Sequence, residues 1–454
     1  MVLNYKRAEM PEEEIMLKRY TGNAMGDLWI ALAKFTGWTK VEIASIEARI
    51  EQGEIQAVVP EGIIKTIKID PDEIDSIEGK TKHDVISYLM HVSPQLPTDL
   101  RPWFHHRMTS MDPQETALFM ALVASLELLI ADVDKLLAVI KQRSFEFKDT
   151  PMIGRTHGIH AEPITFGVKL AKWHDELQRH RSRLIEVRHC IAVGKLSGAV
   201  GMYTLDPKVE ARVCEKLGLR PVLSTQIVPR DFITEYLGVL ANIGGSLGCF
   251  ATTLRGLTRT EIREVMEFFD FEQRGSSAMP HKKNPIGLEN VVSLSRLLGG
   301  YWTVAFQNQI TWDERDLTNS ANERVILPDA SIVLDYALNR FTGILDKLIV
   351  FPEQMMHNIN MMKGLIYSQD VQALVAEKSG LPREEAYGLV REVVMRCWKS
   401  NFELDFFIAL AADDQIVQYV NRDELAQCFN LAEKLKFVDF IFERAYGQVT
   451  ENKL

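Results

Sequence analysis

The sequence predicts an all-α protein with a long helical bundle at its centre, and three observations carry this prediction. Apolar residues recur at steps of four and three between Leu122 and Ile140, which is the period of an amphipathic helix. Residues 236–254 contain no charged side chain, so a helix there would be buried on every side. Strand signals are few, and residues 53–70 form the best short candidate.

The long helices can be placed from their start signals and their lengths. We expect the first to begin at Asp112 as its N-cap, with Pro113 in the first turn and Glu115 at the capping-box position. Four long helices separated by loops with glycine and proline are typical of a bundle. The other three are expected at about 164–192, 236–268 and 288–309.

The chain is too long for one ordinary core, and its pattern predicts three helical domains. We expect a small N-terminal domain over residues 1–110 and a central bundle over 111–356. A loop at 272–288 interrupts the bundle. A small C-terminal helical domain would follow over residues 357–454.

Composition and charge exclude several classes of protein. The 454 residues include 52 basic and 62 acidic side chains, and the formal net charge of −10 argues against a general nucleic-acid binder. The five cysteines are scattered without metal-ligand spacing, as reduced thiols of a cytoplasmic protein are. The first residues lack the apolar core of a signal peptide. We therefore expect a cytoplasmic protein.

The uncharged segment 236–254 is long enough to cross a membrane. Asn242, Ser246 and four glycines dilute its hydrophobicity, and we find no other candidate span. Gly244 and Gly248 form a GxxxG pattern, which lets two helices approach closely in lipid or in a soluble bundle. We expect this segment to lie in the middle of a large soluble assembly, with no membrane partner.

Polar side chains gather in segments that break the helical pattern, and residues 275–290 form the first of these. Glycines and prolines exclude a helix over much of the segment. One interpretation is a solvated connection between helices. The other is a lid over an anionic substrate, with a serine beside cations that stabilise its alkoxide. The polar residues are Ser276, Ser277, His281, Lys282, Lys283 and Glu289.

The second segment, residues 151–167, places glycines and a proline around His157, His160 and Glu162. These three side chains could bind a metal on a helix, but the glycines and the proline disfavour a regular helix and no further ligand is evident. An imidazole acting as a general acid at neutral pH is the better interpretation. We therefore expect no metal.

Two weaker clusters could bind a ligand or serve only the structure. Thr109 and Ser110 could cap the following helix, but Asp112 suits that position better and leaves the hydroxyls for a ligand. His83, His105 and His106 could equally be hydrogen-bonded structural histidines. In residues 312–324 guanidinium forks suit a phosphate, although charged helix surface is the default interpretation. The residues concerned there are Arg315, Ser320 and Arg324.

Together these motifs resemble those of the fumarase/aspartase superfamily, whose members eliminate a group β to a carboxylate and release fumarate. GSSAMPHKKNP resembles the superfamily's signature loop, and GRTHGIHAEPITFG, IGLEN and ERVILPDA are similar to the adenylosuccinate lyase family within it. The resemblance covers nearly the whole chain and implies that superfamily's all-α, three-domain fold, with the bundle as a tetramer core. Further matching segments are KRYTGNAMGDLW, TKHDV, TSMD, GKLSGAVG, STQ and WDERD.

The resemblance implies a role for each matching residue. Ser276 would be the base that removes the Cβ proton of a succinyl group, and His157 the acid that protonates the departing amine. Glu289 would pair with a histidine, and Lys282 would stabilise the carbanion-like intermediate. His83 completes the expected catalytic set. The residues expected to bind substrate are Arg19, Tyr20, Lys82, Asp84, His105, Thr109, Ser110, Gln226, Asn284, Arg315, Ser320 and Arg324.

The physical chemistry of the reaction agrees with these roles. The proton to be removed is very weakly acidic, so the developing dianion needs fixed positive charge and oriented donors. Base and acid act on opposite sides of the C–N bond in an anti elimination, which fits their origin in separate segments. Closure of the loop would exclude water. No metal or organic cofactor is required.

The resemblance also implies partners and leaves alternatives. We expect a homotetramer with active sites shared between three subunits and two nucleotide substrates, adenylosuccinate and succinylaminoimidazole carboxamide ribotide, in purine biosynthesis. A 3-carboxy-cis,cis-muconate cycloisomerase is the alternative enzyme, and the expected nucleotide-binding residues argue against it. A protein that keeps the fold without catalysis is the third hypothesis, and the presence of Ser276, His157, Lys282 and Glu289 argues against that one.

Overall fold

The structure, a computed structural model, describes residues 18–270, 272 and 276–447. The beginning of the expected N-terminal domain and part of the expected loop lie outside the described residues. The chain divides into two compact units, each assembled from three stretches of sequence. Unit 1 contains residues 18–136, 179–249 and 290–341, and unit 2 contains the described residues of 137–178, 250–289 and 342–447. The three-domain division stays a prediction.

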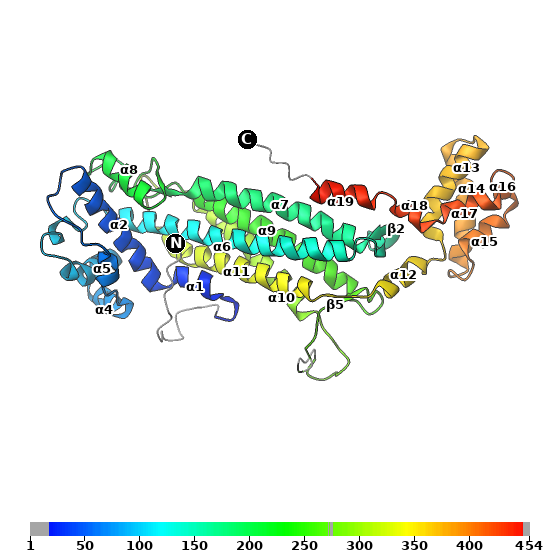
Figure 1. Ribbon diagram of the computed structural model, residues 1–454, viewed down its shortest axis with the longest axis horizontal. Coiled ribbons are helices and arrows are strands. Elements are labelled where there is room, and N and C mark those ends of the chain that lie inside the picture. Colours follow the sequence, from blue (N-terminus) through cyan, green and yellow to red (C-terminus); the bar gives the residue numbers. More distant parts are fainter. Residues whose placement is uncertain (1–17, 271, 273–275, 448–454) are drawn as a thin grey trace. The chain divides into compact units, whose positions relative to one another are not determined.

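Five long helices dominate the described part of the chain and confirm the all-α prediction (Figure 1). Four of them match expected helices. The fifth, α11, was missed because its charged start was interpreted as surface, and Pro328 interrupts its helical pattern. The five are α6 (Met111–Glu146), α7 (Phe166–Ile191), α9 (Asp231–Leu257), α10 (Ile286–Gln307) and α11 (Ser320–Asp346).

Helix α6 begins at Met111, two residues before the first helical residue that an Asp112 N-cap implies, and the predicted capping arrangement is wrong. Asp112 lies inside the helix and its buried carboxylate pairs with Lys195. Glu115 is also buried, and it pairs with Arg230 instead of completing a capping box. Buried cations therefore hold both carboxylates in the interior, and Asp112 also accepts the N–H of Thr109 just before the helix, at 2.8 Å.

Unit 1 packs α9 closely against α10 through the GxxxG glycines. A Cβ atom on Gly244 would lie 2.4 Å from the Cδ1 atom of Leu298, and one on Gly248 would lie 2.7 Å from the Oγ atom of Ser295. Helices α9 and α11 are joined by a hydrogen bond of 2.7 Å between the Tyr236 and Ser331 hydroxyls. The small residues thus serve close packing between helices of one bundle.

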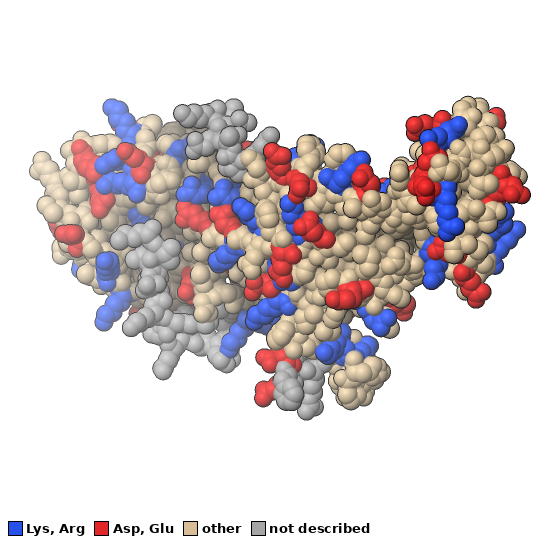
Figure 2. Space-filling view, turned by 45° about the vertical axis from the view of Figure 1, so that its right-hand side comes forward, with Lys and Arg blue, Asp and Glu red and all other residues tan. Residues whose placement is uncertain are grey.

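Two helices, α6 and α9, are long and apolar enough to cross a membrane by length and composition alone. The expectation of a single candidate span was therefore wrong, because α6 also qualifies. Half of each apolar window is already buried inside the protein, and the core helix of a soluble protein passes the same test. On the face shown in Figure 2, acidic and basic side chains are interspersed.

The N-terminal part of unit 1 is a cluster of short helices around α2, with an aromatic centre. Phe35, Trp38 and Tyr88 are buried and pack ring against ring. The strand expected within residues 53–70 is wrong, because this stretch is irregular chain followed by one short helix. Besides the long helices, the elements of unit 1 are η1 (Lys18–Tyr20), α1 (Asn23–Trp29), α2 (Ala31–Glu51), α3 (Ile63–Thr66), α4 (Pro71–Thr81), α5 (Asp84–Val92), η2 (Ser93–Gln95), η3 (Arg101–Trp103), α8 (Pro207–Lys216) and the parallel strands β3 (Val193–Gly194) and β4 (Arg220–Pro221).

Unit 2 contains two antiparallel strand pairs and a group of short C-terminal helices. The expected continuation of α9 to about residue 268 is wrong, because the helix ends at Leu257. Arg263 has a positive φ of 51°, and Glu264 turns inward to pair with Arg155. The elements are β1 (Pro151–Thr156), β2 (Ile159–Thr165), β5 (Val265–Met266), β6 (Ile349–Val350), α12 (Pro352–Asn360), η4 (Leu365–Tyr367), α13 (Ser368–Ser379), α14 (Arg383–Lys399), α15 (Phe406–Ala411), α16 (Asp414–Val417), α17 (Arg422–Cys428), α18 (Leu431–Leu435) and α19 (Val438–Tyr446).

Candidate active site

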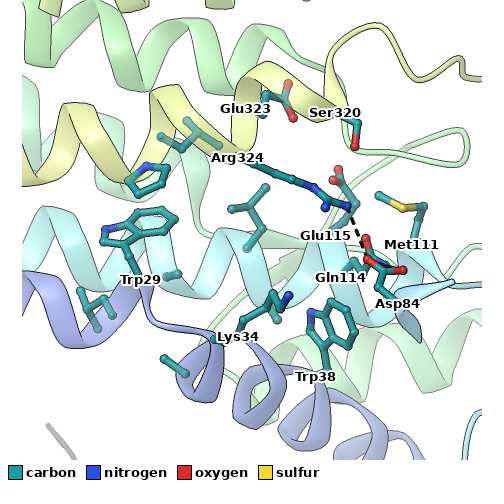
Figure 3. A pocket seen from close by; sticks show the side chains of 18 of the residues that line it. Trp29, Lys34, Trp38, Asp84, Met111, Gln114, Glu115, Ser320, Glu323 and Arg324 are labelled. Atoms are coloured by element: carbon teal, nitrogen blue, oxygen red, sulfur yellow. Dashed lines mark hydrogen bonds and ion pairs between the residues drawn. The ribbon is translucent and has the colours of Figure 1, made fainter. Parts of the chain in front are cut away.

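A cavity of about 390 Å³ in unit 1 brings together four of the residues expected to bind substrate. Asp84 reaches it from the first turn of α5, Arg315 from the chain before α11, and Ser320 and Arg324 from the first turns of α11. Figure 3 shows Trp29, Trp38 and Lys34 on the side formed by α1 and α2. The cavity therefore combines aromatic surface with several charged groups.

The charged groups around this cavity are held by one another. The Nη2 atom of Arg324 lies 3.5 Å from the Oδ2 atom of Asp84, as the dashed line in Figure 3 marks. Gln114 also donates to the Asp84 carboxylate, at 3.3 Å. Arg315 donates to the side-chain oxygen of Gln226 at 2.8 Å, and burial lowers the pKa of its guanidinium. Burial also lowers the pKa of Lys34.

A buried ionic cluster forms one wall of the cavity, and the sequence analysis missed it. Arg230 makes two hydrogen bonds to Glu115, at 2.5 and 2.8 Å, and two to Glu323, at 3.0 and 3.1 Å. Burial opposes the charge on Arg230, but the two carboxylates outweigh it and raise the pKa of the guanidinium. Glu323 lies in the first turn of α11, so the cluster fixes the helix that carries Ser320 and Arg324.

The other expected residues before α6 stand at the ends of short elements. Arg19 and Tyr20 lie in η1, where the Tyr20 ring meets Tyr336 edge to face at 5.1 Å between centroids. Lys82 ends α4 with a positive φ of 58°. His83 caps α5, and its Nδ1 atom accepts from the Ile86 N–H at 3.5 Å.

His105 is held by a buried carboxylate. Its backbone N–H donates to Glu42 at 2.8 Å, and its Nδ1 atom lies 2.7 Å from the other oxygen of the same carboxylate. Burial alone would lower the pKa of His105, but the hydrogen bond to Glu42 and its charge raise the pKa above the usual value. The contact fixes the ring through Nδ1.

The region of the expected acid is a hairpin, a structure the sequence analysis did not foresee. Strands β1 and β2 pair antiparallel, with Thr156 opposite Ile159. The two residues between them, His157 and Gly158, both have positive φ, of 55° and 80°, as in the tight turns that twist-matched hairpins use. Arg155 holds the hairpin in unit 2 by two hydrogen bonds to the buried Glu264, at 3.0 and 2.7 Å. His157 is exposed at the tip.

Ser276 lies in the loop before α10, as expected. Its Oγ atom accepts hydrogen bonds from the N–H groups of Ala278 at 3.3 Å and Met279 at 3.1 Å. Two donors aimed at this oxygen would stabilise an alkoxide. Lys282 is exposed in the next turn.

The end of this loop is fixed to α10 by acidic side chains. The buried Glu267 accepts from the N–H groups of Gly287 at 3.1 Å and Leu288 at 2.7 Å, which satisfies the start of the helix. Glu289 lies in the first turn and pairs with Arg255 at 3.5 Å, not with a histidine of unit 2. Asn284 lies two residues before the helix.

The expected site residues therefore fall into two sets. His157, Ser276, Lys282, Asn284 and Glu289 belong to unit 2, and the remaining members belong to unit 1. Among the described residues, no group of three or more histidine, cysteine or acidic side chains could hold a metal ion.

Comparison with known proteins identifies the class. Residues 8–299 match the family described as Lyase, and residues 364–445 match the one described as Adenylosuccinate lyase C-terminus. The fold is similar to a fumarate lyase from Mesorhizobium sp. BNC1, with a TM-score of 0.85 and 23% identity over 94% of this chain and 98% of that one. It is also similar to a 3-carboxy-cis,cis-muconate lactonizing enzyme from Pseudomonas putida, with a TM-score of 0.84 and 26% identity over 95% and 98%. These matches define an enzyme of the lyase class with the fumarase/aspartase fold.

Sequence relatives narrow the class further. The chain is 43% identical to an adenylosuccinate lyase from Bacillus subtilis (strain 168), over 94% of this chain and 99% of that protein. The chain belongs to the adenylosuccinate lyase family of the fumarase/aspartase superfamily. The resemblance seen in the sequence motifs is thereby confirmed.

Proposed function

We propose that this enzyme cleaves adenylosuccinate to AMP and fumarate, and succinylaminoimidazole carboxamide ribotide to the carboxamide ribotide and fumarate, in purine nucleotide biosynthesis. The observation that carries the proposal is the cavity of unit 1. Asp84, Arg315, Ser320 and Arg324, all expected to bind substrate, line it together. Its volume of about 390 Å³ is in the range of small-molecule sites.

The nucleotide phosphate would be gripped by two guanidinium groups and a hydroxyl. Arg315 and Arg324 provide planar donor forks suited to phosphate oxygens, and Ser320 adds a hydroxyl at the start of α11. The helix N-terminus itself favours an anion. Arg324 would exchange its contact with Asp84 for the phosphate, and Arg19, Tyr20 and Lys82 would complete the nucleotide contacts.

Ser276 would act as the general base. The two N–H groups that contact its Oγ atom are fixed donors, so they would favour the alkoxide that accepts the Cβ proton. Lys282 and Asn284 would then hold the carboxylate onto which negative charge moves. Thr109, Ser110 and Gln226 would bind the succinyl end from unit 1.

His157 would act as the general acid that protonates the departing nitrogen. Its place at the tip of a hairpin, held by the Arg155–Glu264 pair, supports this role because the imidazole is accessible and its backbone is fixed. Glu289 would pair with a histidine from another subunit. His83 would complete the catalytic residues, and His105 would contact the substrate. Neither step needs a metal or an organic cofactor.

The active enzyme would be a soluble, cytoplasmic homotetramer with each site built from three subunits. Exposed apolar side chains on α10 and the chain that follows it support this assembly. Phe306, Ile310 and Trp312 are 57%, 77% and 79% exposed in the single chain, and a group of exposed apolar side chains marks an interaction surface. A helical core shared by four chains would cover them.

The proposal is tested by a spectrophotometric assay of the purified enzyme with adenylosuccinate, in which AMP and fumarate are measured separately. Release of both in equal amounts is expected. A folded protein that releases neither from adenylosuccinate or from the imidazole ribotide would overturn the proposal. Turnover of carboxymuconate in their place would support the lactonizing alternative.

A further inference from the structure

Lys195 and Asp112 form an ion pair in the interior of unit 1, at 2.7 Å between the Nζ and Oδ1 atoms. Their side chains are 0% and 1% exposed. The pair has no role in the reaction described above. Lys195 lies in the GKLSGAVG segment, which belongs to the family resemblance but received no assignment.

All three hydrogen-bond donors of the Lys195 ammonium group are used, and each reaches a different segment. One donates to Asp112 on α6. The second donates to the carbonyl oxygen of Gly198, at 3.0 Å, and the third to the carbonyl oxygen of Gln226, at 3.0 Å. Gln226 is expected to bind substrate, and its side chain also contacts Arg315 of the cavity.

The Asp112 carboxylate extends the network to a second substrate-binding segment. Its Oδ2 atom accepts the N–H of Thr109 at 2.8 Å, and its Oδ1 atom accepts the N–H of Gly198 at 3.2 Å. Thr109 and Ser110 are the residues expected to bind the succinyl end. One buried charge pair thus joins the Thr109 turn to the backbone of Gln226.

The lysine itself is fixed by the same helix. Thr116, one turn after Asp112 on α6, donates its hydroxyl to the Lys195 carbonyl at 2.9 Å and accepts the Lys195 N–H at 3.0 Å. Gly194 allows this close approach, because a Cβ atom there would lie 3.0 Å from the Cγ2 atom of Thr116. Backbone and ammonium group are therefore both anchored to α6.

We propose that Lys195, through Asp112, is a positioning residue that holds Thr109, Ser110 and Gln226 in the geometry that binds the succinyl group. The inference rests on the proposed function. A buried ion pair adds little net stability over a well-packed apolar pair, so stability alone does not account for it. The pair makes hydrogen bonds to the backbone of Thr109 and of Gln226, and an apolar pair could not make them.

The test must separate positioning from folding, because Lys195→Met alone would leave a buried carboxylate without its cation. The double variant Lys195→Met/Asp112→Asn removes both charges at nearly constant volume. We expect it to fold, with a melting temperature lowered because the carbonyl oxygens of Gly198 and Gln226 lose a donor. Its kcat/KM for adenylosuccinate should fall by about tenfold or more, since two oriented segments are released.

Inhibition by the two products locates the defect. Fumarate, which occupies the succinyl end, should inhibit the double variant several-fold more weakly. AMP should be affected less than fumarate, because Ser320 and Arg324 are held by the Arg230 cluster and not by Lys195, and only Arg315 contacts the side chain of Gln226. The matched control is Arg143→Met/Glu146→Gln, which removes another charge pair whose arginine is buried and whose members are not among the expected site residues. It should leave both inhibition constants unchanged.

Two results would overturn the inference while leaving the proposed function intact. One is a folded double variant with normal kinetic constants, which would make the pair purely structural. The other is equal weakening of fumarate and AMP, which would indicate general loosening. Absence of turnover in the unmodified enzyme would overturn the proposed function itself, so the two failures are distinguishable.

Discussion

The cavity of unit 1 and the loop before α10 in unit 2 are built in opposite ways. Around the cavity, Arg315 and Arg324 are held by Gln226 and Asp84, with the ionic cluster of Arg230 behind them. In the loop, Ser276 is held by two N–H groups of its own turn, and Lys282 is exposed. Groups that would grip the substrate are therefore arranged in advance, whereas the serine that we propose as the base lies on a loop that also carries an exposed lysine.

Replacing the expected base should have the largest effect. Ser276→Ala removes the oxygen on which two backbone donors converge, and we expect kcat to fall by about 10³-fold with little change in melting temperature. Ser277→Ala, at the exposed neighbouring position, is the control and should keep nearly full activity. A Ser276→Ala enzyme with normal kcat would remove this serine from the mechanism.

Mixing two inactive variants tests whether Ser276 and His157 of one active site come from different subunits. His157→Gln should be inactive, and His160→Gln on the same hairpin is its control. After subunit exchange with Ser276→Ala, about a quarter of the shared sites in random hybrids would contain both intact groups. Activity of the mixture should rise accordingly. If exchange is demonstrated by labelled subunits and no activity returns, Ser276 and His157 of a site come from the same chain, which counts against the shared site.

A substitution in the cavity should have a smaller effect, and on KM instead of kcat. Arg324→Lys keeps the charge but loses the planar fork, so KM for adenylosuccinate should rise by about tenfold while kcat changes little. Arg340→Lys, exposed on the same helix, is the matched control. Steady-state kinetics decide the matter, and a fall in kcat without a rise in KM would assign Arg324 to the chemical step.

The helical architecture could be predicted because its signals are local. The apolar period between Leu122 and Ile140 and the uncharged segment 236–254 both lie in long helices. The errors arise where distant partners decide the local structure. Asp112 is a good N-cap by propensity, but the buried Lys195 draws it inward, and Glu264 leaves the helical pattern to bind Arg155.

The sequence identified several residues of the candidate site, but it did not indicate how buried contacts arrange them. The motif resemblance identified Asp84, Arg315, Ser320 and Arg324, and the structure places all four around one cavity. The resemblance did not indicate the buried Arg230 cluster, because its members come from three distant segments. A charge inside a run of small and apolar residues, as at Lys195, is the signal that could have found such a network, since a buried charge requires a partner.

The smallest effect that we predict is on the unfolding free energy, which should depend on pH through two carboxyl groups of unit 1. Asp335 on α11 and Asp132 on α6 form a pair of carboxyl groups, with Lys135 beside Asp132. Burial, followed by the hydrogen bond and charge of Asp132, raises the pKa of Asp335 to about 7. Because folding raises this pKa, the protonated Asp335 stabilises the folded protein. This stabilisation is complete below the ordinary pKa range of a carboxyl group and is lost as pH rises through about 7.

The unfolding free energy should therefore fall by about 1 kcal/mol between about pH 6 and about pH 8. Asp335→Asn keeps the shape of the protonated side chain without titrating, so this part of the pH dependence of its melting temperature should vanish. Asp346→Asn, exposed near the end of the same helix, is the control and should behave like the unmodified enzyme. An equal pH dependence in all three proteins would mean that the pair titrates alike in the folded and unfolded chain. The packing of α6 against α11 would then not hold the two carboxyl groups in a fixed environment. Unit 1 would differ less from the exposed loop before α10 than its contacts indicate.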